Sequence, residues 1–144
     1  MAKVFTSNRR VEFCETDAAG IAHFSALMCY MEQAEHAMLR SLGTSVVQPL
    51  DDGWHLSWPR VHVGCDYQGV ARFEDELEID VQVAKLGNKS VTYVITIKNA
   101  GKAIATGRVV AVCCRVKVGQ PLESTPIPAP LAEQLATFFD DSLA

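Results

Sequence analysis

The hydrophobic and polar positions of this 144-residue chain follow two different periods. Residues 23–42 repeat apolar side chains at the spacing of an α-helix, and Gly43 is suited to end that helix. The repeated positions are Phe24, Leu27, Met28, Met31, Ala34, Met38 and Leu42. The first half of the stretch is apolar on nearly every side, which is typical of a helix that other elements enclose. We therefore predict one long helix wrapped by a sheet.

Five other stretches favour β-strands, because apolar and polar residues alternate in them or because they are rich in Val and Ala. The predicted strands cover residues 9–14, 60–67, 76–85, 90–99 and 103–118. Turn sequences at residues 86–89 and 99–102 predict hairpins between the last three strands. The long apolar run 103–118 is expected inside a sheet rather than at its edge.

The remaining segments complete the predicted architecture. Residues 44–59 have no clear period, and residues 121–130 contain four prolines, which exclude a helix or a central strand there. Residues 131–139 have helical spacing and predict a short terminal helix. The fold class is therefore α+β, with a curved antiparallel sheet of about five strands around one long central helix. We expect residues 1–144 to form a single domain.

Composition narrows the class of protein. Hydrophobic residues make up 49% and charged residues 21%, as in globular proteins. A net charge of -4 argues against a non-specific nucleic-acid binder, and no stretch has the roughly 18 apolar residues of a membrane span. The amino terminus lacks the apolar core of a signal peptide, and the five cysteines include no CxxC pair. We expect a cytoplasmic protein with reduced thiols, Cys113 and Cys114 being core residues.

A single sheet around one helix leaves an edge strand and an apolar rim exposed. Pairing with a second copy covers both, so we expect a homodimer. A dimer of dimers, that is a homotetramer, is the larger assembly, and the residues do not choose between the two.

The segment of residues 15–24 carries the most specific chemistry, because Asp17 lies where an extended segment gives way to the helix. Gly20 and its alanine neighbours allow close approach to the carboxylate, and the helix start supplies unpaired backbone N–H groups. A carboxylate beside oxyanion donors suits acyl transfer, with the Phe24 N–H as the candidate donor. The alternative is that Asp17 only caps a turn through local hydrogen bonds.

The run of residues 17–24, followed by Glu32-Gln33-Ala34-Glu35, resembles the acyl-CoA thioesterases of the hot-dog fold, in particular the 4-hydroxybenzoyl-CoA thioesterase-like family. The element order and the segments 73–77 and 86–90 are also similar to that family. The resemblance implies a sheet wrapped around a central helix, a dimer with a continuous sheet, and active sites at the dimer interface. It further implies that Asp17 acts on an acyl-CoA thioester as nucleophile or as general base, without choosing between the two.

Several neighbours of Asp17 are candidates for the same site. His23 is placed to orient the carboxylate or relay a proton, although the family motif requires no His there, and packing is its other role. The acyl pocket is expected along Leu27, Met28 and Met31. The resemblance implies that Glu32 recognises a polar acyl group across the interface, while a paired or solvated helix acid is the alternative.

Coenzyme A would need surface cations, because the chain has no glycine-rich phosphate motif. Arg60, Lys89 and Arg115 lie at predicted strand ends or turns and are the candidates, the alternative being solvated edge charges. His55, His62 and Cys65 match no zinc spacing, so we expect no metal and no cofactor apart from the CoA of the substrate.

The predicted reaction is hydrolysis of an acyl-CoA thioester to a carboxylic acid and CoA. Two alternatives stay open: a non-catalytic module that binds acyl-CoA or an acyl carrier, and an enoyl-CoA hydratase of the same fold that uses an Asp and a His. Release of free thiol separates hydrolysis from hydration. The acyl group, and the choice between CoA and a carrier protein, stay open because the pocket's shape decides them.

Overall fold

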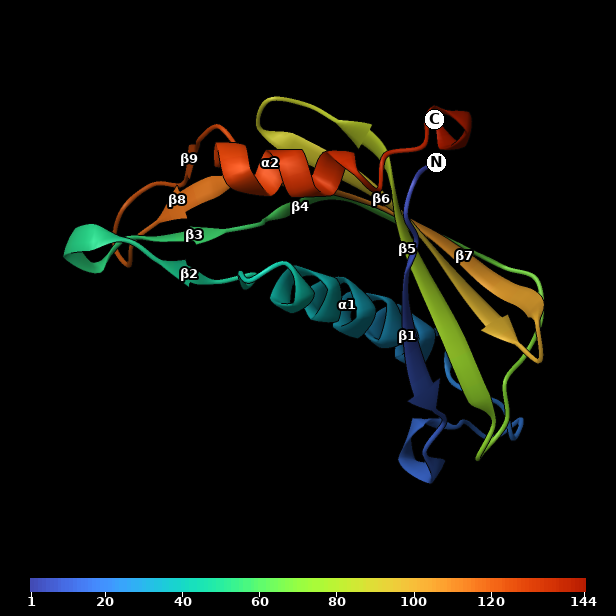
Figure 1. Cartoon of the computed structure of the whole chain (residues 1–144). Helices are drawn as coiled ribbons and strands as arrows, with labels where there is room; N and C mark the ends of the chain where they lie inside the picture. Colours follow the sequence, from blue (N-terminus) through green and yellow to red (C-terminus); the bar gives the residue numbers. More distant parts are fainter.

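The computed structural model describes residues 1–144 as two α-helices, nine strands and three short 3-10 helices (Figure 1). The helices are α1 (Phe24–Ser41) and α2 (Ala129–Ala136), and the 3-10 helices are η1 (Phe13–Glu15), η2 (Asp51–Gly53) and η3 (Asp141–Leu143). The strands are β1 (Phe5–Arg10), β2 (Gln48–Pro49), β3 (His55–Ser57), β4 (Arg60–Tyr67), β5 (Glu76–Leu86), β6 (Ser90–Asn99), β7 (Lys102–Val112), β8 (Cys114–Val116) and β9 (Glu123–Ser124).

The strands form two antiparallel sheets. The larger sheet has the order β1-β5-β6-β7-β4, and the smaller one has the order β2-β3-β8-β9 and extends as an arm to the left in Figure 1. Helix α1 packs against β5, β1, β6 and β7, on one side of the larger sheet. The predicted α+β class, with a five-stranded antiparallel sheet against one long helix, is confirmed. Strand β7, which forms from the predicted run 103–118, lies inside the sheet, as predicted. Strands β1 and β4 are the edges.

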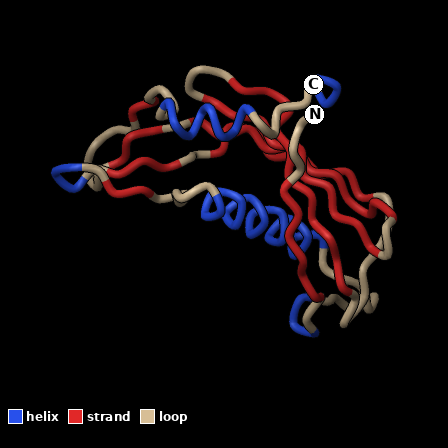
Figure 2. The backbone as a smooth tube through the Cα atoms, in the orientation of Figure 1, coloured by secondary structure: helices blue, strands red, loops and turns tan.

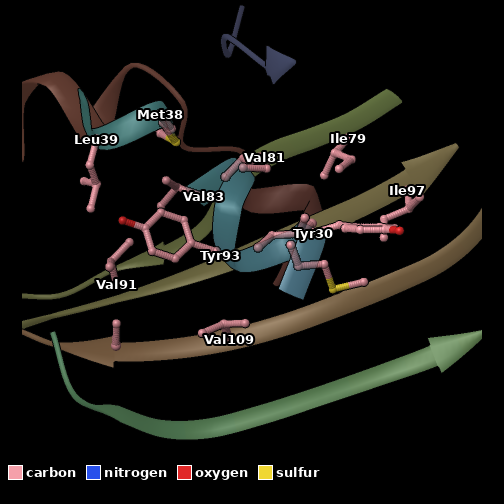
Figure 3. Packing of buried hydrophobic residues seen from close by; sticks show 14 of the residues in the cluster. Tyr30, Met38, Leu39, Ile79, Val81, Val83, Val91, Tyr93, Ile97 and Val109 are labelled. Atoms are coloured by element: carbon pink, nitrogen blue, oxygen red, sulfur yellow. The ribbon is translucent and has the colours of Figure 1, made fainter. Parts of the chain in front are cut away.

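The core lies between α1 and the larger sheet, because both contribute one continuous apolar face. Inward residues alternate along β5 and β6, and they meet the helix face that carries Tyr30, Met38 and Leu39 (Figure 3). Burying each large apolar side chain is worth roughly 1.5–3 kcal/mol, so this interface holds α1 in place. Cys113 and Cys114 are buried, as predicted.

Helix α1 is less enclosed than its sequence indicates. Its bounds agree with the predicted helix to within one residue, but Phe24, Cys29 and Glu32 are exposed. The sheet covers one side of the helix, and an apolar and polar strip along the other side remains open. The helix therefore offers a second face to a further layer.

The first predicted strand, at residues 9–14, is wrong. Strand β1 ends at Arg10, and η1 follows at Phe13–Glu15. The register of β1 is set by pairing with β5, from Phe5 opposite Val81 to Arg10 opposite Glu76, and its inward side includes Ser7 and Arg9. The strand is held by its neighbour rather than by its own hydrophobicity, so its alternation is weak.

The run of residues 103–118 is not one strand. It breaks at Cys113, whose N–H donates to the Lys89 carbonyl (2.7 Å) and whose carbonyl accepts from the Thr125 N–H (2.8 Å). The chain passes there from β7 in the larger sheet to β8 in the arm. The segment of residues 44–59, predicted as irregular, supplies β2 and β3 to the same arm.

The proline-rich segment also departs from its prediction, because α2 begins inside it at Ala129. Pro130 lies in the first turn of α2, where a helix has no hydrogen bond to lose through the missing N–H. Helix α2 ends at Ala136, before the predicted end. Beyond it the Lys3 N–H donates to the Thr137 carbonyl (2.8 Å), so the two ends of the chain lie together (Figure 2).

Candidate active site

The loop between β1 and α1 holds Asp17 in a tight turn. The Asp17 N–H donates to the Ile21 carbonyl and the Gly20 N–H donates to the Asp17 carbonyl, both at 2.9 Å. The Ala19 N–H donates to Asp17 Oδ1 at 2.8 Å, and Gly20 takes the positive φ of 77° that the turn requires. Asp17 therefore makes the local hydrogen bonds of a turn, which its alternative role as a turn cap predicts. Its exposed carboxylate keeps Oδ2 without a protein partner.

His23 caps the start of α1. Its Nδ1 accepts a hydrogen bond from the Ser25 N–H at 3.2 Å and lies 2.7 Å from Ser25 Oγ. Accepting at Nδ1 places the proton of the neutral ring on Nε2. The ring also packs on Phe24, with centroids 4.4 Å apart. His23 thus has a structural use at the helix start, and its predicted catalytic role stays a prediction.

The first backbone N–H of α1, that of Phe24, makes no hydrogen bond in the structure, as expected for the N1 position. The Phe24 side chain is 61% exposed, so the N–H is close to solvent. The carbonyl of the same residue, which belongs to the next peptide unit, accepts a hydrogen bond from Tyr67 Oη in β4 at 3.0 Å. The helix start therefore presents a fixed, unused donor a short distance along the chain from Asp17.

Glu15 clamps this loop to the body of the protein. Its Oε1 accepts hydrogen bonds from Tyr30 Oη (2.7 Å) and the Glu12 N–H (2.8 Å), and its Oε2 pairs with the Arg9 guanidinium. Its main-chain carbonyl accepts from the His23 N–H at 2.8 Å, so the same residue holds both ends of the loop. Burial and the Glu15 carboxylate raise the pKa of Tyr30 and keep it a donor.

Sequence reasoning missed this clamp of Glu15, Arg9 and Tyr30. The sequence pattern places Tyr30 in the predicted helix 23–42 and Arg9 in the predicted strand 9–14, and neither position indicates a contact with Glu15. An acidic residue two positions before Asp17 was the one available signal, because a loop that must be rigid needs a side chain tied to another element.

A pocket of about 230 Å³ lies between α1 and the strands β4 and β7. Its lining is mainly apolar and consists of Met28, Cys29, Met31, Glu32, Glu35, Arg60, Val63, Gly64 and Val109. Of the residues predicted for the acyl pocket, Met28, Met31 and Glu32 line it. Leu27 does not, because it points into the core and is 3% exposed.

One wall of the pocket is a buried ion pair. Arg60 Nη2 lies 2.7 Å from Glu35 Oε2, and the two side chains are 22% and 2% exposed. Arg60 Nη1 also donates to the Trp58 carbonyl at 3.1 Å. Burial raises the pKa of Glu35, and the charge of Arg60 opposes that rise.

The three candidate CoA cations lie in different surroundings. Arg60 faces the pocket and Glu35, although its position at a predicted strand end suggested a surface side chain. Lys89 is exposed in the turn between β5 and β6. Arg115, on the arm, stacks over Trp54 with 4.6 Å to the ring centroid and lies 3.4 Å from Glu123. Their role toward CoA stays a prediction, and the place of Arg60 lends it no support.

No cluster of three His, Cys, Asp or Glu side chains is arranged to hold a metal ion. Neither helix combines the length and the apolar character needed to cross a membrane.

Comparison with known proteins gives one consistent result. A family model described as the thioesterase superfamily matches residues 19–106. The chain is 28% identical over 127 residues to a 1,4-dihydroxy-2-naphthoyl-CoA hydrolase of Synechococcus elongatus, covering 88% of this chain and 91% of that protein. The range matched by the family model starts two residues after Asp17, so it includes the start of α1 but not the Asp17 carboxylate.

Two solved structures share the fold. The first is a 1,4-dihydroxy-2-naphthoyl-CoA thioesterase from Synechocystis, which is 21% identical with a TM-score of 0.79 and covers 93% of this chain and 96% of its own. The second is a gentisyl-coenzyme A thioesterase, which is 25% identical with a TM-score of 0.76 and covers 90% of this chain and 98% of its own.

Proposed function

The chain belongs to the thioesterase superfamily, and we propose that it hydrolyses an acyl-CoA thioester at the site formed by Asp17 and the start of α1. The family resemblance read from the sequence, that of a hot-dog thioesterase, is confirmed. The observation that carries the proposed mechanism is the Phe24 N–H, which is held rigidly at a helix start and has no acceptor. A thioester oxygen supplies that acceptor.

The proposed chemistry places negative charge where the protein offers a donor. Attack on the thioester carbon turns its oxygen into an oxyanion, and one preorganised donor stabilises such an oxyanion by roughly 2.7–4 kcal/mol. The Phe24 N–H is that donor, and the positive end of the α1 dipole adds to its effect. The Tyr67 hydroxyl, bonded to the Phe24 carbonyl in the next peptide unit, ties the first residue of α1 to β4.

Asp17 supplies the second half of the reaction in one of two ways. As a general base it takes a proton from water, the hydroxide adds to the thioester carbon, and the proton passes to the sulfur of CoA as the C–S bond breaks. As a nucleophile it adds to the carbon itself, CoA leaves as the thiolate, and water hydrolyses the resulting anhydride. The free Oδ2 of Asp17 serves either route.

We propose that a second copy of the chain completes the site. Strand β4 is an edge strand and exposes Val61, Val63 and Tyr67, which are 66%, 46% and 43% exposed. An exposed apolar edge of this kind favours strand pairing. The open side of α1 lies next to the same edge, because Tyr67 and Arg60 of β4 both bond to α1. Pairing of two β4 strands would cover the edge and bring both helix faces together.

The decisive experiment is a thiol-release assay on aryl, short-chain and long-chain acyl-CoA esters, with Asp17→Asn as the test variant. Asn keeps the size and the turn bonds of Asp but cannot act as a base, so kcat should fall at least about a hundredfold. Asp141→Asn, an exposed acid in η3, is the matched control and should keep normal activity. Equal activity of Asp17→Asn and wild type would disprove the assignment.

The same assay decides the alternatives. A hydratase would consume an enoyl-CoA without releasing thiol, and it would depend on His23, whose Nδ1 is already used to cap α1. A binding module would retain acyl-CoA, or a carrier-protein thioester, without turnover.

A further inference from the structure

The Arg60–Glu35 ion pair lies in the wall of a mainly apolar pocket, whose other charged residue is Glu32. Glu35 is almost fully buried, and a charge in such a place is costly unless it is paired. Met28, Met31, Val63 and Val109 of the same pocket would pack as well against an apolar pair of similar volume. Stability alone therefore gives no reason for the pair, and its place in the pocket suggests that a ligand uses it.

The guanidinium of Arg60 still has donors to offer. Arginine carries five N–H donors, of which two are used here, by Glu35 and by the Trp58 carbonyl, leaving three. The carboxylate of Glu35 accepts from Arg60 through Oε2, and no partner bonds Oε1. The wall of the pocket thus holds both unused donors and an unused acceptor, with a combined charge of zero.

Two contacts show how this pair lies relative to the proposed reaction centre. Tyr67, at one end of β4, bonds to Phe24, and Arg60, at the other end, bonds to Glu35 eleven residues further along α1. Strand and helix therefore run antiparallel, and Phe24 and Glu35 are separated by about 16 Å along the helix axis. That distance is longer than a one-ring acyl group.

A two-fold dimer through β4 closes this distance. When two β4 strands pair antiparallel over their full length, Arg60 of one protomer lies opposite the partner's Tyr67. The partner's Tyr67 holds the partner's Phe24, so the Arg60–Glu35 pair of one protomer faces the helix start of the other. The pocket of each protomer would then serve the reaction centre of its partner.

We infer that the Arg60–Glu35 pair is the specificity determinant of the acyl pocket and binds the far end of an acyl group whose thioester lies at the partner's Asp17 and Phe24. The inference rests on the proposed function. An uncharged group that both donates and accepts hydrogen bonds, such as a hydroxyl, fits the pair. Its O–H donates a hydrogen bond to Glu35, and its oxygen accepts one from Arg60. A carboxylate is repelled by Glu35, and a hydrocarbon end leaves the spare N–H groups of Arg60 and Oε1 of Glu35 without hydrogen-bond partners.

The test uses benzoyl-CoA and 2-naphthoyl-CoA esters that carry hydrogen, hydroxyl or carboxylate at the far ring position, so that length and polarity vary separately. Wild type should prefer the hydroxyl ester over the unsubstituted one by at least about tenfold in kcat/KM, at one of the two lengths. Arg60→Met/Glu35→Leu, which replaces the pair by apolar residues, should bring that ratio close to one while thiol release continues. Lys98→Met/Glu78→Leu makes a similar change at a pair outside the pocket, 3.5 Å apart and 29% and 53% exposed, and should leave the ratio unchanged.

A second variant guards against misfolding of the first. Glu35→Gln keeps the shape of the side chain but leaves Arg60 with a net positive charge, so preference should move toward the carboxylate ester by about tenfold. A wild-type hydroxyl preference near one, or variants that release thiol with the wild-type ratios, would overturn the inference. Absence of thiol release by wild type on every ester would instead overturn the proposed function.

A mixed dimer tests the exchange between protomers. One protomer carries Asp17→Asn, and the other carries Arg60→Met/Glu35→Leu. If the pocket serves the partner, one site keeps both an intact Asp17 and an intact pair, and the mixed dimer, once separated from the two homodimers, shows the wild-type hydroxyl preference. If each pocket serves its own protomer, the one surviving Asp17 works beside the altered pocket and the preference is lost, which would refute the crossed arrangement.

Discussion

Gly107 in β7 gives Met31 the space it occupies beside the pocket. A Cβ added at residue 107 would lie 2.4 Å from Met31 Sδ, 3.1 Å from Met31 Cε and 3.6 Å from the Gly64 carbonyl oxygen. Carbon and sulfur atoms in ordinary contact stand at about 3.5–4.0 Å or more, so Sδ has to move by at least about 1 Å. Met31 is 3% exposed, and one of its sides faces the pocket.

The Gly107→Ala substitution should therefore push Met31 into the pocket. Adding a methyl group to a packed core costs about 1–3 kcal/mol. Methionine is flexible and the pocket is open on one side, so we expect about 1 kcal/mol, the lower end of that range. The loss in kcat/KM should be larger for bulky acyl-CoA esters than for small ones, because the displaced side chain takes up pocket volume.

A double-mutant cycle with Met31→Ala isolates this contact. Met31→Ala alone should cost about 2–5 kcal/mol, as large-to-small core changes do. On that background Gly107→Ala should cost less than about 0.5 kcal/mol, giving a coupling energy near that of the single clash. Urea unfolding followed by circular dichroism measures each free energy of unfolding.

Gly87→Ala is the control, because residue 87 lies in the turn between β5 and β6, outside the pocket lining, and its added Cβ would first meet the movable Ser90 side chain, at 3.0 Å from Oγ. Additive effects of Gly107→Ala and Met31→Ala would refute the reasoning, and so would unchanged discrimination between bulky and small esters. Additivity would mean that the cost of Gly107→Ala does not come from its contact with Met31, and unchanged discrimination would mean that Met31 moves away from the pocket rather than into it.

Two further predictions concern the open edge and a partly buried histidine. Val61→Lys puts a charge on the exposed β4 edge, where it should prevent pairing of two protomers. Sedimentation at micromolar concentration should show a dimer for wild type and a monomer for the variant, which should release little thiol. A fully active monomer would contradict the shared site. Burial, with Arg60 and Arg40 adding to it against Glu32, lowers the pKa of His36, whose Nε2 is buried without a partner. The unfolded chain then binds this proton more readily, so stability falls as pH drops through about 6.5. His36→Leu should flatten the fall in unfolding free energy between pH 7 and pH 5, and an equal slope in both proteins would contradict this.

The fold was predictable where local pattern and tertiary contacts agree. Strand β6 occupies the predicted residues 90–99, and β5 extends the predicted run by one residue, because both bury one face and show the other. Strand β1 was misplaced because its position comes from pairing with β5, a partner about 70 residues away. The strands of the arm are two or three residues long, too short to show a period.

The candidate site divides in the same way. Asp17, Phe24 and the methionines were accessible because they lie within one short segment and one helix face. The pairing of Arg60 with Glu35, or of Arg9 with Glu15, depends on how the sheet lies on α1. No spacing in the sequence encodes that contact, and a lone arginine at a strand end is more often a solvated charge.

The order of strands in the larger sheet also bears on how the protein folds. Strands β5, β6 and β7 form consecutive hairpins, whereas β1 must find β5 across about half of the chain, pairing Phe5 with Val81. Long-range pairing costs more loop-closure entropy and slows folding, so the hairpins should form early and β1 should dock late. The loop that carries Asp17 follows β1 directly. Catalytic competence is therefore expected to be the last property that the folding chain acquires and the first that a loosened β1 removes.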